Sequence, residues 1–315
     1  MRSIPMAAAA ALLASLAPAL PVAAQTSIAP APATIEVPFN PPLDTPLRYQ
    51  VSTSRAARPG QPALALRWVE ELRFTRVEGG FLAYWRMDWA SLPPEMRSPA
   101  VAPMVKPLTG EPIALELDAT GTVLRVHDWP AARAKILAAV EGTRPLVPAA
   151  VAAQVMPKVR EMYEALTAET AVPMILKNLG PVFEFGGVSM APGEVRSGQV
   201  EQPVSIGGGT VTANMSLTLS ALEAGRTATF VSRREIDKES MQRLMERVIA
   251  QFGAADRAAA ERQRVELAKT PMMMTDITTT VVDLSTGLPV RLDNATTGSD
   301  APATPVKTLS LVWLR

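Results

Sequence analysis

Cysteine is absent from this sequence, and histidine occurs only once, at position 127. Without cysteine the chain can form no disulfide, thiolate zinc site or iron–sulfur cluster, and it has no thiol nucleophile. It also has no cysteine that could be acylated, so we do not expect a lipoprotein. The sequence contains no H-E-x-x-H motif and no carboxylate-rich calcium loop. We therefore predict neither a bound metal nor a cofactor.

The charge balance shows no excess of either sign, with 31 basic and 30 acidic residues. This balance gives no electrostatic footprint for nucleic acid and no attraction to an anionic membrane. The 48% hydrophobic content excludes disorder, and no apolar run after the N-terminal region is long enough to span a bilayer. We expect a globular protein with an ample core and no stable membrane insertion once its N-terminal segment is removed.

The N-terminal segment has the pattern of a secretory signal peptide. Arg2 provides a positive charge, an Ala/Leu-rich stretch follows, and small residues precede Gln25. This pattern predicts a signal peptide over residues 1–24, cleavage after Ala24, and a periplasmic or secreted protein. A helical membrane anchor is disfavoured because the apolar stretch is short and ends at a proline. Residues 25–46 are rich in Pro and Ala, and we expect them to form an extended lead-in.

Two stretches of the chain resemble each other, and each predicts a β-hairpin. In both, an apolar run ends in an Asp shortly before a Thr-Gly turn, and a second apolar run follows. Gly121 and Gly287 can adopt the positive φ that tight hairpin turns require, and Asp118 and Asp283 can bond nearby turn amides. Because the two glycines have the same predicted role, substitution of either should destabilise the fold to a similar extent.

The remaining pattern predicts an α+β fold. Residues 47–315 are expected to form a single domain made of two β-rich halves, residues 47–127 and 192–315, with a helical insert over residues 128–180. The alternation of apolar and polar residues over 211–221 is the cleanest strand signal. The order of strands, helices, strands, helix and strands favours antiparallel pairing. We predict a curved antiparallel sheet of roughly ten strands, open or half-barrel, covered by helices.

Five short motifs, most of them turn-forming, follow one another in an order that resembles a group of secreted bacterial proteins of unknown function. They are Leu47-Arg48-Tyr49, Pro107-Leu108-Thr109-Gly110, Leu117-Asp118-Ala119-Thr120-Gly121, Pro192-Gly193-Glu194-Val195-Arg196-Ser197-Gly198 and Val282-Asp283-Leu284-Ser285-Thr286-Gly287-Leu288. The resemblance covers most of the predicted mature chain and implies no activity. The plan of strands and helices is also similar to that of the periplasmic lipoprotein carriers, in which helices cover a curved open sheet; this similarity concerns the fold alone.

Two residues are candidates for catalysis, and we interpret both as non-catalytic. His127 follows a strand and directly precedes a helix cap, which is typical of a solvated histidine. Ser189 lies in a stretch that resembles the Gly-x-Ser-x-Gly nucleophile elbow, but Ala191 replaces the second glycine and no βα unit surrounds it. We predict that the protein is not an enzyme. A serine hydrolase, in which Ser189 and His127 converge, is the third hypothesis.

Three further features allow more than one interpretation. Gly207-Gly208-Gly209 could approach a phosphate, but it lacks the Lys and helix of a P-loop, so a hairpin turn is the better interpretation. Met241 and Met245, with the run Met272-Met273-Met274, could bind copper(I), form an adaptable apolar surface or pack in the core, and core packing is favoured. Glu70 interrupts an apolar strand face. It lies at a water-filled mouth of the sheet, or pairs with an Arg, or marks a bulge.

Together these observations predict a non-catalytic exported protein of the cell envelope that binds or carries an apolar ligand, such as a lipid or acyl chain, or binds an envelope protein. The alternative is a structural or interaction module with a filled core and no ligand. Large apolar residues on predicted strands and helices form the expected ligand lining: Trp68, Trp85, Trp89, Met215, Leu217, Met241 and Met245.

Overall fold

The computed structural model describes most of the chain after the predicted signal peptide. The described residues are 34–57, 62–176, 178–203, 210–223, 225–252, 265, 274–298 and 305–315. They belong to one compact unit. The predicted signal peptide, the Gly207-Gly208-Gly209 turn, Met272 and Met273 lie outside them. Within these ranges no helix has both the length and the apolar character needed to cross a membrane.

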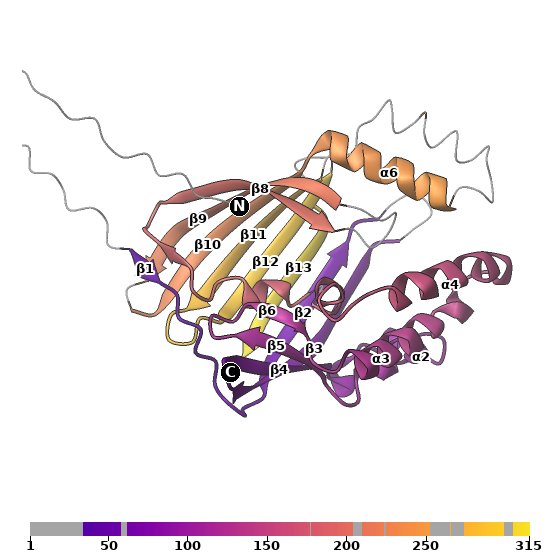
Figure 1. Cartoon of the computed structure of the whole chain (residues 1–315), viewed down its shortest axis with the longest axis horizontal. Coiled ribbons are helices and arrows are strands. Elements are labelled where there is room, and N and C mark those ends of the chain that lie inside the picture. The colour runs from indigo at the N-terminus through magenta and orange to yellow at the C-terminus, as the bar shows by residue number, and fades with distance from the viewer. Residues whose placement is uncertain are drawn as a thin grey trace, which may run out of the picture. The chain divides into compact units, whose positions relative to one another are not determined.

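The protein has an α+β fold dominated by one open antiparallel sheet of eleven strands (Figure 1), which confirms the predicted fold class. The strand order is β6-β5-β4-β3-β2-β13-β12-β11-β10-β9-β8. The strands are β2 (Leu47–Arg55), β3 (Leu64–Val77), β4 (Gly80–Met87), β5 (Ile113–Asp118), β6 (Val123–Val126), β8 (Val195–Pro203), β9 (Thr210–Glu223), β10 (Thr227–Ile236), β11 (Met274–Asp283), β12 (Pro289–Gly298) and β13 (Pro305–Leu314). A separate two-stranded sheet joins β1 (Ile35–Glu36) to β7 (Ser189–Met190). Strands β2 and β13 join the N-terminal and C-terminal halves of the large sheet.

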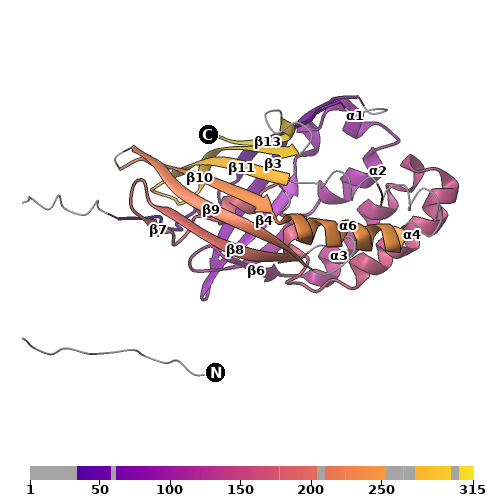
Figure 2. The same cartoon turned by 90° about the horizontal axis from the view of Figure 1, so that it is seen from above.

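The helices lie in the segments that connect the strands. They are α1 (Pro94–Arg97), α2 (Ala102–Val105), α3 (Trp129–Glu141), α4 (Ala149–Glu164), α5 (Val172–Ile175) and α6 (Lys238–Phe252), with 3-10 turns η1 (Trp89–Ser91), η2 (Lys106–Leu108), η3 (Arg144–Leu146) and η4 (Gly180–Phe183). Asp128 caps α3 by accepting a hydrogen bond from the amide of Ala131. In two perpendicular views, α3, α4 and α6 lie at one end of the sheet (Figures 1 and 2).

Both predicted hairpins are confirmed. Gly121 and Gly287 have φ values of 87° and 73°, a region that side chains other than glycine rarely adopt. Asp118 accepts hydrogen bonds from two turn amides at 2.8 and 2.9 Å, and Asp283 accepts one at 2.8 Å. These bonds hold the pKa of both carboxyl groups below its ordinary value, although burial acts in the opposite direction on each.

One chain segment packs against both turns, which the sequence did not suggest. A Cβ on Gly121 would lie 2.3 Å from the ring of Phe39, and a Cβ on Gly287 would lie 1.7 Å from the carbonyl oxygen of Pro38. The Asn40 amide also donates a 2.9 Å hydrogen bond to the carbonyl of the residue before Gly287. Both glycines are therefore needed for close approach as well as for backbone conformation. Phe39 is buried although it lies in the expected lead-in.

A single segment also links two hydrophobic clusters on one side of the sheet. We call residues 171–176 and 178–190 the crossing segment. Phe183 packs edge-to-face on Phe74 with ring centroids 6.2 Å apart, and Phe185 contacts the Phe230 ring at 4.8 Å. Phe183 belongs to the large cluster, which covers β2–β6 and extends to β12 and β13, and Phe185 belongs to the smaller cluster on β9–β11. We call the side of the sheet that faces this segment the inner face.

Candidate functional site

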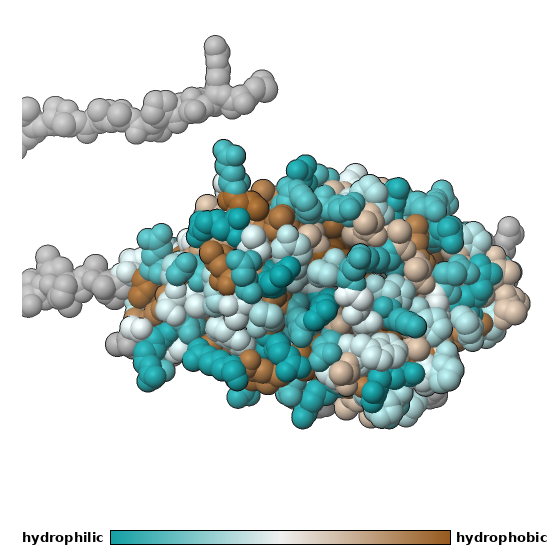
Figure 3. Space-filling view, turned by 90° about the horizontal axis from the view of Figure 1, so that it is seen from below, coloured by the Kyte–Doolittle hydropathy of each residue, from teal (hydrophilic) through white to brown (hydrophobic). Residues whose placement is uncertain are grey.

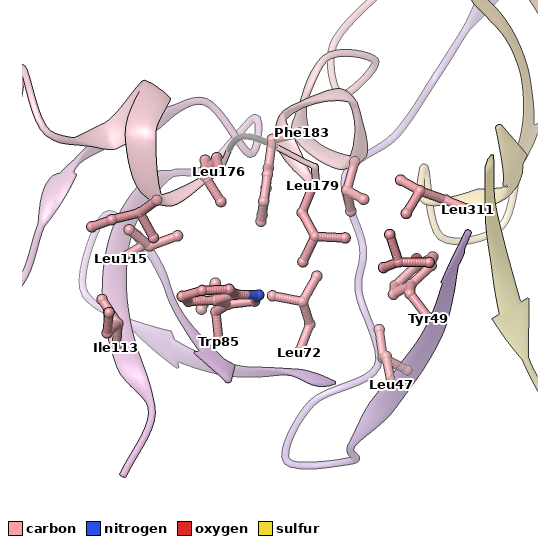
Figure 4. Packing of buried hydrophobic residues seen from close by; sticks show 14 of the residues in the cluster. Leu47, Tyr49, Leu72, Trp85, Ile113, Leu115, Leu176, Leu179, Phe183 and Leu311 are labelled. Carbon is pink, nitrogen blue, oxygen red and sulfur yellow. The ribbon is translucent and has the colours of Figure 1, made fainter. Parts of the chain in front are cut away.

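The inner face of the β2–β5 region is filled by side chains. Trp68 and Trp85, two of the predicted ligand-lining residues, are each only 6% exposed. The crossing segment covers them with four apolar side chains, several of which point toward Trp85 and Leu72 in Figure 4: Leu176, Leu179, Val182 and Phe183. Trp89 in η1 is partly buried against the same cluster. These three tryptophans therefore pack in a filled core.

Glu70 lies within this core and makes three side-chain hydrogen bonds. Its Oε1 accepts from Trp68 Nε1 at 2.9 Å and from Asn178 Nδ2 at 3.3 Å, and its Oε2 accepts from Trp85 Nε1 at 2.7 Å. Only 2% of Glu70 is exposed, and its strand pairs without a register shift on either side. Within the described residues no arginine contacts it. The three explanations offered by the sequence, a water-filled mouth, an Arg partner and a bulge, are therefore wrong.

Burial raises the pKa of the Glu70 carboxyl, and the three hydrogen bonds act against that rise. The donors come from three elements, because Trp68 lies on β3, Trp85 on β4 and Asn178 on the crossing segment. Glu70 therefore supplies the hydrogen-bond acceptors for the side-chain N–H groups of these three residues. It also fastens the crossing segment to the sheet.

The crossing segment covers less of the inner face on β9–β13. The side chains there form rows across the sheet that are charged, polar or apolar. Residues paired across antiparallel strands point to the same side, so the register defines rows that run across the sheet. A charged row contains Met215, Arg234, Asp276, Thr296, Lys307 and Arg55. A polar row follows with Leu217, Ser232, Thr278, Asn294, Leu309 and Thr53. An apolar row follows with Leu219, Phe230, Thr280, Leu292, Leu311 and Val51.

Solvent access falls in the same direction. Arg55 and Lys307 are exposed, and most other side chains of the charged and polar rows are half-buried. In contrast, every member of the apolar row is at most 1% exposed. Met215 and Leu217, both predicted to line a ligand site, are half-buried and lie at the β9 end of the two accessible rows. This part of the inner face is therefore a partly open surface with a closed apolar floor.

Hydrogen bonds organise the polar side chains of these rows. Asn294 Nδ2 donates to Thr278 Oγ1 at 2.8 Å, and Thr296 Oγ1 donates to Asp276 Oδ1 at 2.5 Å. Glu184, on the crossing segment, is a further acidic residue near these rows. Part of its side chain is exposed to solvent, and protein atoms lie around the rest. This partial burial raises the pKa of Glu184, and the positive charge of Arg234 opposes the rise.

Helix α6 packs beside the start of β9. The Thr212 amide donates a 2.8 Å hydrogen bond to Ser240 Oγ near the helix N-terminus. Met241 is buried and Met245 is half-buried, so the two methionines contribute to packing at this end. In the described part of the chain no group of three or more His, Asp or Glu side chains is placed to hold a metal ion.

His127 and Ser189 lie on different elements. The His127 ring is half-exposed, as expected for a solvated residue, and its Nδ1 lies 2.8 Å from Oε1 of Glu116. Hydrogen bonds from Arg125 and His127 lower the pKa of Glu116. Ser189 is on β7, and its carbonyl accepts a hydrogen bond from Arg196. Among the described residues, no hydrogen bond connects Ser189 with His127.

Three hollows lie on the outer surface formed by the described residues. One, of about 470 Å³, lies over β8–β10 and includes Ser216, Arg233 and Glu235. Others of about 480 and 240 Å³ lie near Asp283 and Tyr84. On the face shown in Figure 3, hydrophobic residues form small groups among hydrophilic ones. Because the half-buried charged and polar rows lie on the inner face, we place the candidate site on the inner face of β9–β13 and β2.

Comparisons with known proteins add no assignment. No protein-family model matches the chain, no curated protein matches it, and no solved structure matches it. The resemblance to secreted bacterial proteins of unknown function, and the similarity of plan to periplasmic lipoprotein carriers, therefore stay predictions.

Proposed function

We propose that this protein is a non-catalytic binding or carrier protein of the cell envelope, and that it binds a lipid or another molecule with an acyl chain. One observation carries the proposal. On β9–β13 the charged and polar rows of the inner face are mostly half-buried and the apolar row is closed, whereas the same face on β2–β5 is filled. A partly open surface that carries accessible apolar side chains, Met215 and Leu217, in the same rows as charged and polar ones suits a ligand with a polar and an apolar part.

The apolar part of such a ligand would contact Met215 and Leu217 on β9. Methionine side chains adapt to irregular ligands because they are unbranched and flexible. Burial of about ten methylene groups contributes at most about 8 kcal/mol, from which the cost of association is subtracted. Association costs at least about 4 kcal/mol, so apolar burial alone is expected to give binding no tighter than about the millimolar range.

The chemistry of the chain supports a non-catalytic role. There is no cysteine, and the single histidine is engaged with Glu116 at the surface. A nucleophilic serine needs a base within hydrogen-bond reach, and Ser189 has no such contact with His127 in the described residues. The predicted signal peptide supports a site of action in the periplasm or outside the cell.

A second candidate function is a structural or interaction module without a ligand. The filled core around Trp68 and Trp85 favours it, because these residues already have apolar neighbours. The two candidates differ in what they predict for the accessible rows of the other half. Only the first requires that Met215 meets a ligand.

A fluorescent-probe titration separates the two. The mature protein is titrated with 1-N-phenylnaphthylamine, whose emission rises in apolar surroundings. Met215→Asp places a charge on the inner face of β9, and Ser216→Asp places the same charge on the outer face one residue further along. We expect Met215→Asp to weaken binding about tenfold or more, and Ser216→Asp to change it less than about twofold. Absence of probe binding to the wild type, or equal effects of the two variants, would contradict the proposal.

A further inference from the structure

Two cations lie directly opposite each other on the inner face. Lys307 on β13 is paired in register with Arg55 on β2. Both point to the same side as Leu309 and Thr53, which lie two residues away on the same strands. Side chains at directly opposite positions have Cβ atoms about 4.5–5.5 Å apart, and like charges at such positions repel each other.

No anionic side chain among the described residues compensates this repulsion. Within the described residues, neither Arg55 nor Lys307 takes part in an ion pair or side-chain hydrogen bond. Arg48, on the outer face of the same strand β2, differs: it lies 3.1 Å from Asp88 and 3.8 Å from Glu71. Among the described residues, β2 therefore has an ion-paired cation on its outer face, Arg48, and an unpaired one on its inner face, Arg55.

The surroundings of this pair suit an anion held at a partly open surface. Thr296, in the same row, is buried and donates to Asp276, so the carboxylate of that row already has a hydrogen bond from a neighbour. Asp276 lies two strands away from Lys307. Arg234 adds a third basic residue to the row, on the far side of Asp276.

We propose that Arg55 and Lys307 form a binding site for an anionic group, a phosphate or a carboxylate, and that this group is the head of the amphipathic ligand. The second half of this inference rests on the proposed function. A guanidinium can bind either anion through two parallel hydrogen bonds, and the ammonium adds a compact positive charge. An anion between the two side chains converts their repulsion into two attractive contacts.

The test compares three probes on the full mature chain by isothermal titration calorimetry: dodecyl phosphate, dodecanol and inorganic phosphate. Wild type should bind dodecyl phosphate about tenfold more tightly than dodecanol. Arg55→Gln and Lys307→Gln should each remove most of this preference, and added salt should reduce it. The matched control is Arg67→Gln, which removes an exposed cation from the outer face of β3 and should leave the preference unchanged.

The outcomes separate the site from the proposed function. If wild type binds dodecanol and dodecyl phosphate equally, and no phosphate, the anion site is wrong while the carrier function stands. If inorganic phosphate alone binds and Arg55→Gln abolishes it, the anion site is supported with a free anion as its source, and the carrier function fails. Binding of none of the three probes contradicts both. Retention of the phosphate preference in both glutamine variants contradicts the assignment of these two residues.

Discussion

The indole nitrogen of Trp85 donates a 2.7 Å hydrogen bond to Oε2 of Glu70, a carboxylate of which only 2% is exposed. The other oxygen of Glu70 accepts from Trp68 and from Asn178. A buried carboxylate without a cation is costly unless its oxygens are satisfied, and here three donors satisfy them. This cluster joins two neighbouring strands to the crossing segment, so it fixes how the inner face of β2–β5 is filled.

Replacement of Glu70 by Gln should destabilise the protein by about 1–3 kcal/mol. Glutamine keeps the shape but turns one acceptor into an NH₂ donor, which must face an indole N–H or Asn178. Urea unfolding followed by circular dichroism measures the change. Glu71→Gln is the control, because Glu71 lies on the outer face and makes ion pairs that are worth at most about 1 kcal/mol. Equal stability of Glu70→Gln and wild type would show that the cluster has no role in the fold.

Stability should depend on pH through Glu70. Burial raises the pKa of Glu70 above its ordinary value of 4.5, so the folded state binds the proton more tightly than the unfolded chain does. The stabilisation linked to this proton is complete below about pH 4.5 and is lost as the pH rises through the raised pKa. The difference in unfolding free energy between wild type and Glu70→Gln should therefore shrink from pH 4 toward pH 8. A difference that stays constant or grows over that range is incompatible with a raised pKa.

The two hairpin glycines should differ in their sensitivity to substitution, because their neighbours differ. Gly287→Ala would place a Cβ against the backbone oxygen of Pro38, which cannot move aside, whereas Gly121→Ala would meet the ring of Phe39. Gly225 is the control, since its φ is 70° and a Cβ at this position would have no neighbour within 4 Å among the described residues. We expect about 1 kcal/mol of strain at Gly225, and about 1–3 kcal/mol more at the other two, with Gly287 the largest. Thermal unfolding of the three variants tests this order, which an equally mild effect at Gly287 and Gly225 would refute.

Export should produce a chain that begins at Gln25. The small residues before this position suit signal peptidase, and a bulky charged residue at the last of them should block cleavage. Intact-mass measurement and N-terminal sequencing of the protein from the periplasm or culture medium test the expectation, with Ala24→Lys as the blocked form. Recovery of wild-type protein that retains Met1 in the membrane fraction would overturn it.

Patterns among neighbouring residues predicted the sheet and its hairpins. Contacts between residues far apart in the chain could not be predicted from such patterns. Strand periodicity and the Gly121 and Gly287 turns depend on neighbouring residues, so the sequence indicates them directly. The role of Glu70 depends on Asn178, which lies 108 residues away in the chain. Phe183 and Phe185 lie in a segment without clear periodicity, so nothing local indicates that it fills the inner face.

For the candidate site, too, the sequence predicted what depends on neighbouring residues and missed what depends on distant ones. Met215 and Leu217 were predicted as lining because their strand alternates cleanly, and the structure places both on the accessible part of the inner face. Trp68 and Trp85 were expected there for the same reason, but the crossing segment covers them. The opposition of Arg55 and Lys307 depends on pairing between the first and last strands of the large sheet in chain order, a register that no local pattern specifies.

Native mass spectrometry of the wild-type protein, purified without detergent from the periplasm or culture medium in which we expect it, tests most directly whether it binds an amphipathic ligand. We expect a population heavier than the bare chain by the mass of one lipid-sized molecule, which is released on collisional activation and detected as an anion. Arg55→Gln and Lys307→Gln should lower this population, and Arg67→Gln should not. A wild-type protein of bare mass that also takes up no added dodecyl phosphate or dodecanol would contradict the claim that it binds an amphipathic ligand.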